Sequence, residues 1–212
     1  MIKAVLLDID GTMRDSRAMI YHSYTETFKH FQLPMPDKTG IASYMYTGPE
    51  RLFEHFAPHH NTQELTDYYR SILGGVLDKI GVYSGVPETL QTLKQKGLKL
   101  GVFSASKYAR SDLASGGLDV FMDVIVDGHA VVRPKPFPDG AELALKKLGV
   151  DPADAIMVGD LPADIEAGKA AHLRATVALT HGFGTKELLQ ASKPDYIIDS
   201  FPELSGVVEK LG

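Results

Sequence analysis

Short apolar runs that alternate with helical segments constrain the fold of this chain more than any other feature of its sequence. Six runs have the near-continuous apolar character of strands buried on both faces: Ala4–Ile9, Leu98–Phe103, Asp123–Val126, Ala155–Val158, Ala175–Leu179 and Tyr196–Ile198. The segments between them have helical patterns, several with Pro in the first turn and Gly near the end: Pro87–Lys96, Tyr108–Ser115, Pro138–Leu148, Pro162–Ala171, Thr185–Ala191 and Pro202–Leu211. This alternation predicts an α/β fold with a doubly wound, mainly parallel sheet.

One long segment lacks the alternation. Its periodicity is helical and no strand is predicted within it, so residues 14–81 form an expected all-helical cap domain. Residues 1–13 and 82–212 form the expected core domain. The aromatic residues that share one helical face are expected to pack inside the cap: Tyr21, Tyr24, Phe28 and Phe31. Because the insert follows the first strand, it enters at the sheet edge where open α/β folds bind ligands, and it is placed to act as a lid.

Composition excludes several classes of protein. Apolar residues make up 44% of the chain and charged residues 23%, which allows a buried core and argues against disorder. Lys and Arg total 22 against 27 Asp and Glu, and the resulting charge of −5 argues against nucleic acid as a partner. The chain has no Cys, which excludes disulfides and Cys-based zinc sites. No apolar stretch has the length of a signal peptide or a membrane span, so we expect a cytoplasmic protein, monomeric or homodimeric, with no membrane partner.

Two carboxylates stand where the first strand ends, in the sequence Asp8-Ile9-Asp10-Gly11-Thr12. Alternation points them to opposite faces along a strand, but a turn at Gly11 lets Asp10 swing back toward the cleft that Asp8 faces. Asp8 could then act as a nucleophile while Asp10 moves a proton to and from the leaving group. In the alternative interpretation, Asp8 caps backbone amides and Asp10 only begins a turn.

A second acidic pair follows another predicted strand. Asp160 stands at the tip of the run Ala155–Val158, and Asp164 lies one helical turn further on. Carboxylate oxygens gathered at strand ends favour a hard divalent cation, and Mg²⁺ fits best because it is held by few protein ligands together with substrate phosphate oxygens. Helix capping by Asp160 is the alternative, but it does not explain why acids gather at two strand tips.

Two further positions point to an anionic ligand. Ser104 ends the run Leu98–Phe103, and with a helix that opens at Ser106 and Lys107 it makes an anion cradle or, alternatively, an ordinary helix cap. Lys135 has Pro on both sides, which stiffens the backbone and fixes where the ammonium points. A solvated loop lysine is the alternative.

The ordered set of these motifs resembles the four motifs of the haloacid dehalogenase superfamily of phosphatases. The residues that carry the resemblance are Asp8-x-Asp10-Gly11-Thr12, Ser104, Lys135-Pro136 and Gly159-Asp160-x-x-x-Asp164. The resemblance covers nearly the whole chain. The insert resembles the C1 cap of that superfamily, and His181-Gly182-Phe183-Gly184 is similar to the C-terminal stretch of phosphoglycolate phosphatase-like members.

The resemblance implies a role for each acidic motif residue. By that likeness, Asp8 forms an aspartyl-phosphate and Asp10 is the acid and base. The implied Mg²⁺ ligands are Asp8, the backbone carbonyl of Asp10, and Asp160, while Asp164 supports the metal through water or orients Lys135. The core fold implied is Rossmann-like.

Substrate contacts are also implied, with one departure from the superfamily pattern. The candidate substrate-binding residues are Gly11, Thr12, Arg51, Ser104, Ala105 and Lys135, and of these Ser104 and Lys135 are also counted as catalytic. Many members have Asn after the Ser, where this chain has Ala105, which puts phosphate affinity in question there but not the reaction type.

Cap residues are expected to choose the substrate. Tyr44, Tyr46 and Gly48-Pro49-Glu50-Arg51 lie in the middle of the insert, and Gly48-Pro49 resembles the cap signature of phosphoglycolate phosphatases and related pyrophosphatases. Arg51 could pair with a substrate carboxylate or second phosphate, or it could be a surface residue bonded to Glu50 or Glu54. Arg14 could reach the cleft, or it could only mark the hinge where the chain enters the cap.

These observations predict a Mg²⁺-dependent phosphatase that hydrolyses a small phosphorylated metabolite, a phosphoglycolate-like phosphomonoester, through an aspartyl-phosphate. The alternatives are a pyrophosphatase, a nucleotide or sugar-phosphate phosphatase, and a β-phosphoglucomutase-like mutase, although Ile20 stands where such mutases have a cap His. A true dehalogenase or a phosphonate-cleaving relative is disfavoured by Asp10. A non-catalytic binding module is disfavoured because all four motifs keep competent residues.

Overall fold

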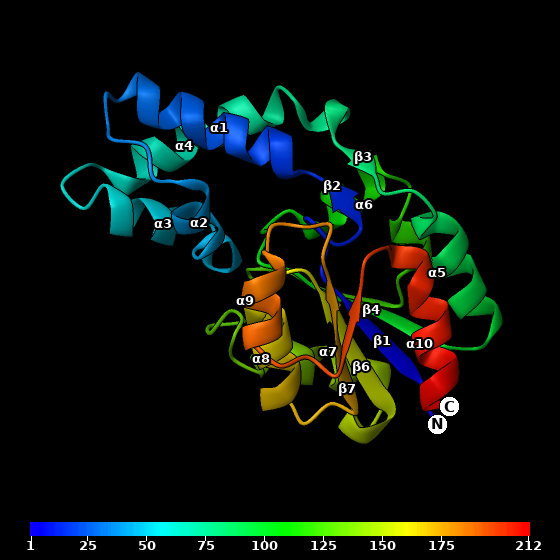
Figure 1. Cartoon of the computed structure of the whole chain (residues 1–212). Helices are drawn as coiled ribbons and strands as arrows, with labels where there is room; N and C mark the ends of the chain where they lie inside the picture. The colour runs from blue at the N-terminus through cyan, green and yellow to red at the C-terminus, as the bar shows by residue number, and fades with distance from the viewer.

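A parallel sheet and a group of helices above one of its edges make up the computed structural model (Figure 1), which describes residues 1–45, 47–77 and 79–212. Within those residues the sheet has six strands in the order β5-β4-β1-β6-β7-β8, all paired in parallel. The strands are β1 (Ala4–Leu7), β4 (Lys99–Phe103), β5 (Val124–Val126), β6 (Ala155–Gly159), β7 (Ala175–Leu179) and β8 (Tyr196–Ile198). Each matches one of the predicted runs, so the predicted Rossmann-like α/β fold is confirmed.

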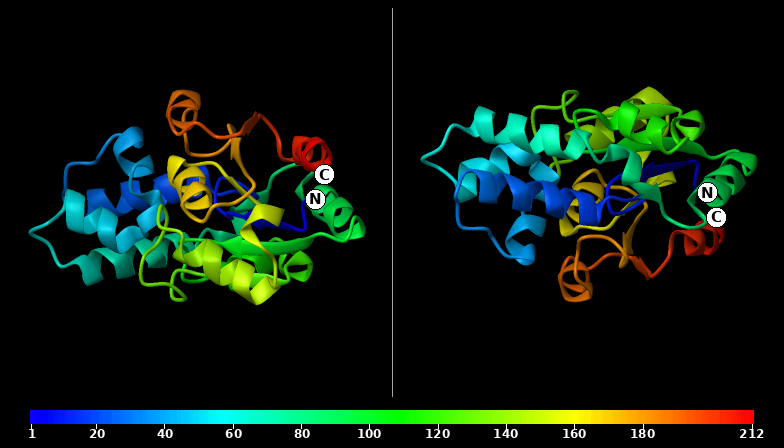
Figure 2. Two further views of the ribbon diagram at one scale, coloured as in Figure 1. Left: turned by 90° about the horizontal axis from the view of Figure 1, so that it is seen from below. Right: turned by 90° about the horizontal axis from the view of Figure 1, so that it is seen from above.

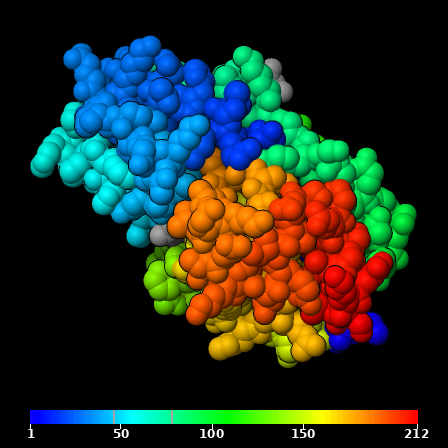
Figure 3. All heavy atoms as spheres, in the orientation of Figure 1, coloured from blue at the N-terminus to red at the C-terminus, as the bar shows by residue number. Residues whose placement is uncertain are grey.

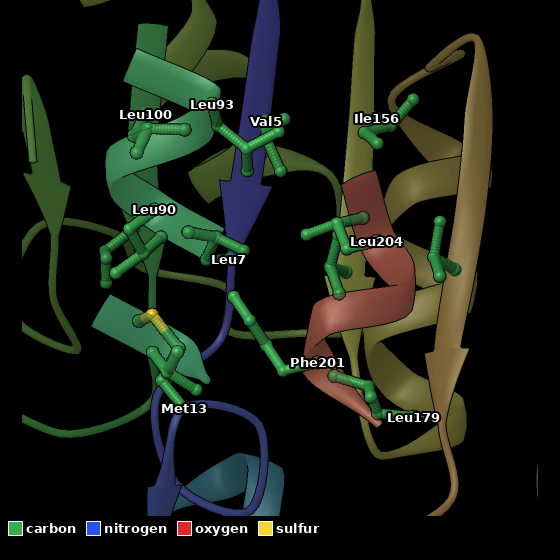
Figure 4. Close-up of a cluster of buried hydrophobic side chains, with 14 of the residues drawn as sticks. Val5, Leu7, Met13, Leu90, Leu93, Leu100, Ile156, Leu179, Phe201 and Leu204 are labelled. Carbon is green, nitrogen blue, oxygen red and sulfur yellow. The ribbon is translucent and has the colours of Figure 1, made fainter. Parts of the chain in front are cut away.

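Helices cover both faces of this sheet. They are α5 (Val86–Gln95), α6 (Ala109–Ser115), α7 (Asp139–Leu148), α8 (Pro162–Ala170), α9 (Lys186–Ala191) and α10 (Leu204–Leu211). Residues of α5, α6 and α10 share one hydrophobic cluster with β1, and residues of α7 and α8 form a cluster on the other face. Figure 4 shows Leu90 of α5 and Leu204 of α10 on opposite sides of Leu7 in this first cluster. Burying one such side chain contributes about 1.5–3 kcal/mol, so the two clusters fix the sheet edge on which the site is built.

The insert is helical, as predicted, and its described residues form α1 (Arg17–His30), α2 (Lys38–Ala42), α3 (Pro49–Phe56) and α4 (Thr62–Gly74), with short 3-10 turns at Met45–Thr47 and Leu77–Lys79. Tyr24 and Phe28 are almost fully buried between these helices, and Tyr24 stacks on Tyr69 with ring centroids 4.3 Å apart. Tyr21 and Phe31 pack at the edge of the same cluster. The predicted aromatic face is therefore the interior of the cap.

The cap contacts the core through both apolar and polar side chains. Leu161 and Phe183 of the core belong to the hydrophobic cluster of the cap, and Arg17 donates from Nη1 to the carbonyl oxygen of Gly182 at 2.8 Å. On the face seen in Figure 3, the blue first cap helix meets the orange segment that follows β7. Figure 2 shows the cap at one end of the molecule and both termini at the other.

The connection between cap and core differs from the prediction in one respect. No strand was predicted between Arg14 and Gly81, but β2 (Arg14–Asp15) pairs antiparallel with β3 (Gly81–Val82). Strands of two residues are too short to produce an alternating sequence pattern, so their pairing leaves no signal. The segment that enters the cap and the segment that leaves it are thus paired with each other near the sheet edge. No helix in the described part of the chain has the length and apolar character needed to cross a membrane.

Candidate active site

Three predicted site residues follow three neighbouring strands. Asp8 follows β1, Ser104 follows β4 and Asp160 follows β6. Leu7 is in register with Val102 on one side and with Val158 on the other, so the three strands end together. The chain crosses from one half of the sheet to the other at β1, and ligands of such sheets bind at that point. All three residues are buried, with exposures of 8%, 3% and 0%.

A single ammonium group links two of the buried carboxylates. Lys135 lies 2.5 Å from Oδ1 of Asp8 and 2.6 Å from Oδ1 of Asp164, and it is 3% exposed. Asp164 is fixed in turn, because its Oδ2 accepts from the backbone N–H of Leu161 at 2.9 Å. Burial alone would lower the pKa of Lys135, but Asp164 and Asp8 outweigh it and hold that pKa above its usual value. Lys135 is therefore a fixed positive charge beside Asp8.

Asp160 is held from two directions. Its Oδ1 accepts from the hydroxyl of Thr12 at 2.7 Å, and its Oδ2 accepts from the backbone N–H of Phe183 at 2.7 Å. Burial, followed by repulsion from Asp164, raises the pKa of Asp160 to about 7. Thr12 is completely buried, so the structure places its hydroxyl against Asp160.

Gly11 allows this close arrangement. Its φ is +85°, and a Cβ added there would lie 2.3 Å from Oδ2 of Asp160. A larger residue would therefore be strained and would also collide with the carboxylate. The tight turn at Gly11 is closed by its N–H, which donates to the carbonyl oxygen of Arg14 at 2.9 Å.

The donor set suits a divalent cation. Asp8, Asp160 and Asp164 are all buried, and of these Asp8 and Asp164 contact Lys135. Burial, with repulsion from the other two acids, raises the pKa of Asp8 well above its usual value. A divalent cation would relieve this excess of negative charge. In the described part of the chain no three His, Cys, Asp or Glu side chains form a metal cage. The ligand set that the resemblance implies, two carboxylates and one backbone carbonyl, would suit Mg²⁺, because it keeps water or substrate oxygens as its other ligands.

A cavity of about 720 Å³ lies between these strand ends and the cap. Six of the predicted site residues line it: Asp8, Asp10, Arg51, Ser104, Ala105 and Lys135. The remaining ones, Gly11, Thr12, Asp160 and Asp164, are buried beside or behind Asp8 and Lys135. Burial, together with repulsion from Asp112, raises the pKa of Asp10. The structure thus brings nucleophile, acid and ammonium candidates to one cavity wall.

The loop after β4 differs from the expected anion cradle. Helix α6 begins at Ala109, so Ser106 and Lys107 precede it rather than open it. The hydroxyl oxygen of Ser104 accepts from the backbone N–H of Ser106 at 3.1 Å, which shapes the loop. The predicted segment Tyr108–Ser115 agrees with α6 to within one residue, but the predicted opening at Ser106 and Lys107 was wrong, because side-chain contacts rather than helix propensity shape this loop.

On the cap side, Arg51 is exposed at the cavity wall. Glu50 does not pair with Arg51. Its Oε1 instead lies 2.7 Å from Nη2 of Arg70 and 2.6 Å from Nζ of Lys107. The contact with Lys107 joins α3 of the cap to the loop after β4 of the core. Tyr46 lies outside the described residues.

Sequence reasoning missed two contacts of this site. The backbone N–H of Phe183 binds Asp160, although the two are 23 residues apart, and Lys107 binds Glu50 across 57 residues. A backbone donor leaves no side-chain signature, and neither pair has a helical or strand spacing. The Gly182-Phe183-Gly184 motif was the one available signal, because glycines mark a close backbone approach.

The comparisons with known proteins agree with this geometry. The pattern of the haloacid dehalogenase-like hydrolase family matches residues 5–178. The chain is 32% identical over 208 residues to pyrophosphatase PpaX of Bacillus velezensis, covering 96% of this chain and 94% of the relative. A crystal structure of a predicted phosphoglycolate phosphatase from Haemophilus somnus matches with a TM-score of 0.82 and 25% identity, covering 98% of both chains. The fold is also that of a β-phosphoglucomutase from Clostridium difficile, with a TM-score of 0.87 and 22% identity over 100% of this chain and 97% of that one.

Proposed function

The chain belongs to the haloacid dehalogenase-like hydrolase family, and from that premise we propose that it hydrolyses pyrophosphate through a phosphorylated Asp8. The identity with pyrophosphatase PpaX over almost the whole of both chains supports this substrate. The sequence alone favoured a phosphoglycolate-like ester and kept pyrophosphate as the alternative. The relatives support that alternative better than the first choice.

The observation that carries the proposal is the pair of Asp8 and Lys135 at the wall of one cavity, with Asp164 buried behind them against Lys135. In the proposed reaction, a carboxylate oxygen of Asp8 attacks the phosphorus atom, and the bond from phosphorus to the leaving oxygen breaks. Lys135, fixed by Asp164 at 2.6 Å, neutralises negative charge beside the attacking carboxylate. Mg²⁺, held by Asp8, Asp160 and the backbone carbonyl of Asp10, would supply further neutralisation of the phosphoryl oxygens.

Asp10 is the proposed acid and base. Its pKa is raised by burial and by the charge of Asp112, which favours a carboxyl that carries a proton when the leaving group departs. After departure, the same group in its ionised form accepts a proton from the water that attacks the phosphorylated Asp8. The water oxygen becomes part of the released phosphate, and Asp8 regains its carboxylate.

The cap is proposed to close the cavity and to select the substrate. We assign residues 14–81 to this domain, and residues 1–13 with 82–212 to the core. Arg51 is a candidate contact because it lies at the cavity wall. Ile20, which also lines the cavity, offers no proton-transferring group, and this argues against a mutase reaction.

A phosphoglycolate-like monoester is the second candidate, favoured by the 25% identity to the Haemophilus somnus protein over 98% of both chains. Phosphate release from pyrophosphate, phosphoglycolate and p-nitrophenyl phosphate with Mg²⁺ separates the two. We expect the highest kcat/KM with pyrophosphate. A higher value with phosphoglycolate supports the monoester. No phosphate release above the background of the Asp8→Asn variant, with any of the three, contradicts the proposed hydrolase reaction.

A further inference from the structure

Arg14 is a buried charge in the cavity wall that the proposed reaction does not use. It belongs to β2, the first segment of the chain to leave the core, and its side chain is 1% exposed. It lines the same cavity as Asp8 and Asp10. Its backbone N–H donates to Ile9 at 3.0 Å, so the residue is held in the turn that carries Asp10.

The pairing of this guanidinium is incomplete. Nη1 lies 3.5 Å from Oδ1 of Asp112, beyond the length of a strong charge-assisted hydrogen bond. The other carboxylate oxygen of Asp112 accepts from the hydroxyl of Ser106. Among the described residues, Nε and Nη2 of Arg14 have no hydrogen-bond partner although both atoms are buried. Each unpaired buried donor is costly, so a residue kept only for packing would be better served by an apolar side chain.

The unpaired N–H groups of Arg14 indicate what kind of ligand would bind them. A guanidinium offers five N–H groups in a planar fork that matches a pair of oxygens on a phosphoryl or carboxylate group. Arg14 and Lys135 are separate positive charges on one cavity, and Lys135 is already occupied by Asp8 and Asp164. A substrate with a second anionic group can therefore place one group beside Asp8 and the other against Arg14.

We propose that Arg14 binds the second anionic group of the substrate, either the departing phosphoryl group of a diphosphate or the carboxylate of a short phosphomonoester. This inference rests on the proposed function, since it takes the phosphoryl group that reacts to lie at Asp8. It makes Arg14, rather than the exposed Arg51, the residue that selects small substrates carrying two anionic groups.

The test compares substrates with and without the second anion. We would measure kcat/KM for pyrophosphate, phosphoglycolate and phenyl phosphate in the wild type, Arg14→Lys, Arg14→Met and Arg110→Met. Arg110 is exposed on α6 outside the cavity, so its variant controls for loss of one positive charge. We expect Arg14→Met to lose about 10- to 100-fold more kcat/KM with a substrate that carries a second anionic group than with phenyl phosphate, which has only one. Arg110→Met should leave that ratio unchanged.

The pattern of loss identifies the group that Arg14 binds. A selective loss with pyrophosphate assigns the second phosphoryl group, and a selective loss with phosphoglycolate assigns the carboxylate. An equal loss with all three substrates means that Arg14 only supports the fold, and this result overturns the inference.

Equilibrium binding tests the inference independently of turnover. Calorimetry would compare methylenediphosphonate with methylphosphonate, in the presence of Mg²⁺, on the wild-type protein. We expect the first to bind at least about tenfold more tightly, and Arg14→Lys to reduce that ratio. Equal affinity for the two compounds in the wild type overturns the inference even if an Arg14 variant does not fold. A wild type that binds them unequally but hydrolyses no substrate contradicts the proposed reaction and leaves the assignment of Arg14 standing.

Discussion

The two walls of the cavity differ in how firmly their charges are held. On the core wall, Lys135 is 3% exposed and contacts two carboxylates, Asp8 at the end of β1 and Asp164 in the first turn of α8. On the cap wall, Glu50 has a side-chain exposure of 26%, its partner Lys107 in the core loop has one of 37%, and Arg51 is exposed. Fixed dipoles and charges in a water-poor site act strongly on a transition state, whereas exposed pairs contribute little. This contrast predicts large losses of activity from substitutions in the core wall and small losses from substitutions in the cap wall.

Asp8→Asn should produce the largest effect. The amide cannot form the phosphorylated carboxylate, so we expect kcat with pyrophosphate to fall by at least about 10⁴-fold. Thermal unfolding should remain cooperative, since the variant keeps the size of the side chain. Asp154→Asn is the matched control, because Asp154 pairs with Lys3 just before β6, far along that strand from Asp160. Substantial turnover by Asp8→Asn would contradict the prediction that substitutions in the core wall cause the largest losses of activity.

Asp160→Asn tests the proposed metal site. An Asn fits the same contacts, with its oxygen accepting from Phe183 and its amide donating to the hydroxyl of Thr12, so the fold should persist. We expect kcat/KM to fall by at least about 100-fold, since even a partner of a metal ligand costs 10- to 100-fold when removed.

Metal binding can be measured without turnover. For the wild type, Mg²⁺ at ten times its Kd should raise the free energy of unfolding by about 1.4 kcal/mol, and this gain should vanish in Asp160→Asn. Chelation should remove activity from the wild type, and added Mg²⁺ should restore it. An equal Mg²⁺-dependent gain in both proteins would place the metal elsewhere.

Gly11→Ala should have an intermediate effect, which we expect in the stability of the core wall. The new Cβ meets Asp160 at 2.3 Å at a φ of +85°, so we expect the free energy of unfolding to fall by about 2–3 kcal/mol. Gly149→Ala is the matched control, because its φ is +65° and no atom lies within 4 Å of the added Cβ. That variant should cost only the backbone strain, about 1 kcal/mol. Chemical denaturation measures both, and equal losses would mean that Asp160 moves aside freely.

The core wall was predictable from the sequence because strands carry it. Asp8, Ser104 and Asp160 each follow an apolar run, and parallel strands bring their carboxyl ends to one edge. Lys135 was predicted from its flanking prolines and the resemblance to known motifs. Its pairing with Asp164 was left as one of two possibilities, because a sequence does not specify which neighbour a long side chain reaches.

The cap wall was less predictable for a physical reason. Glu50 forms ion pairs with Lys107 and Arg70 rather than with the adjacent Arg51. The pair with Lys107 depends on how the cap is positioned against the core. The pairing of β2 with β3 depends on the same positioning and involves two residues on each side. Arg14 had two equally good interpretations until its incomplete pairing was known. Contacts between the cap and the core leave no periodic pattern in the sequence of either part.

Glu50→Gln should give the smallest effect and sharpen the contrast. The amide keeps the shape of the side chain but breaks the charge pairing that joins the cap to the loop after β4. Because exposed ion pairs contribute about 0.2–1 kcal/mol, we expect kcat/KM to fall only about two- to fivefold. Part of the dependence of kcat/KM on salt concentration should disappear, since added salt weakens this pair in the wild type. Glu209→Gln breaks an exposed pair with Lys96 away from the cavity and should leave both quantities unchanged. A loss above about 100-fold in Glu50→Gln would show that the cap wall acts in the reaction as strongly as the core wall.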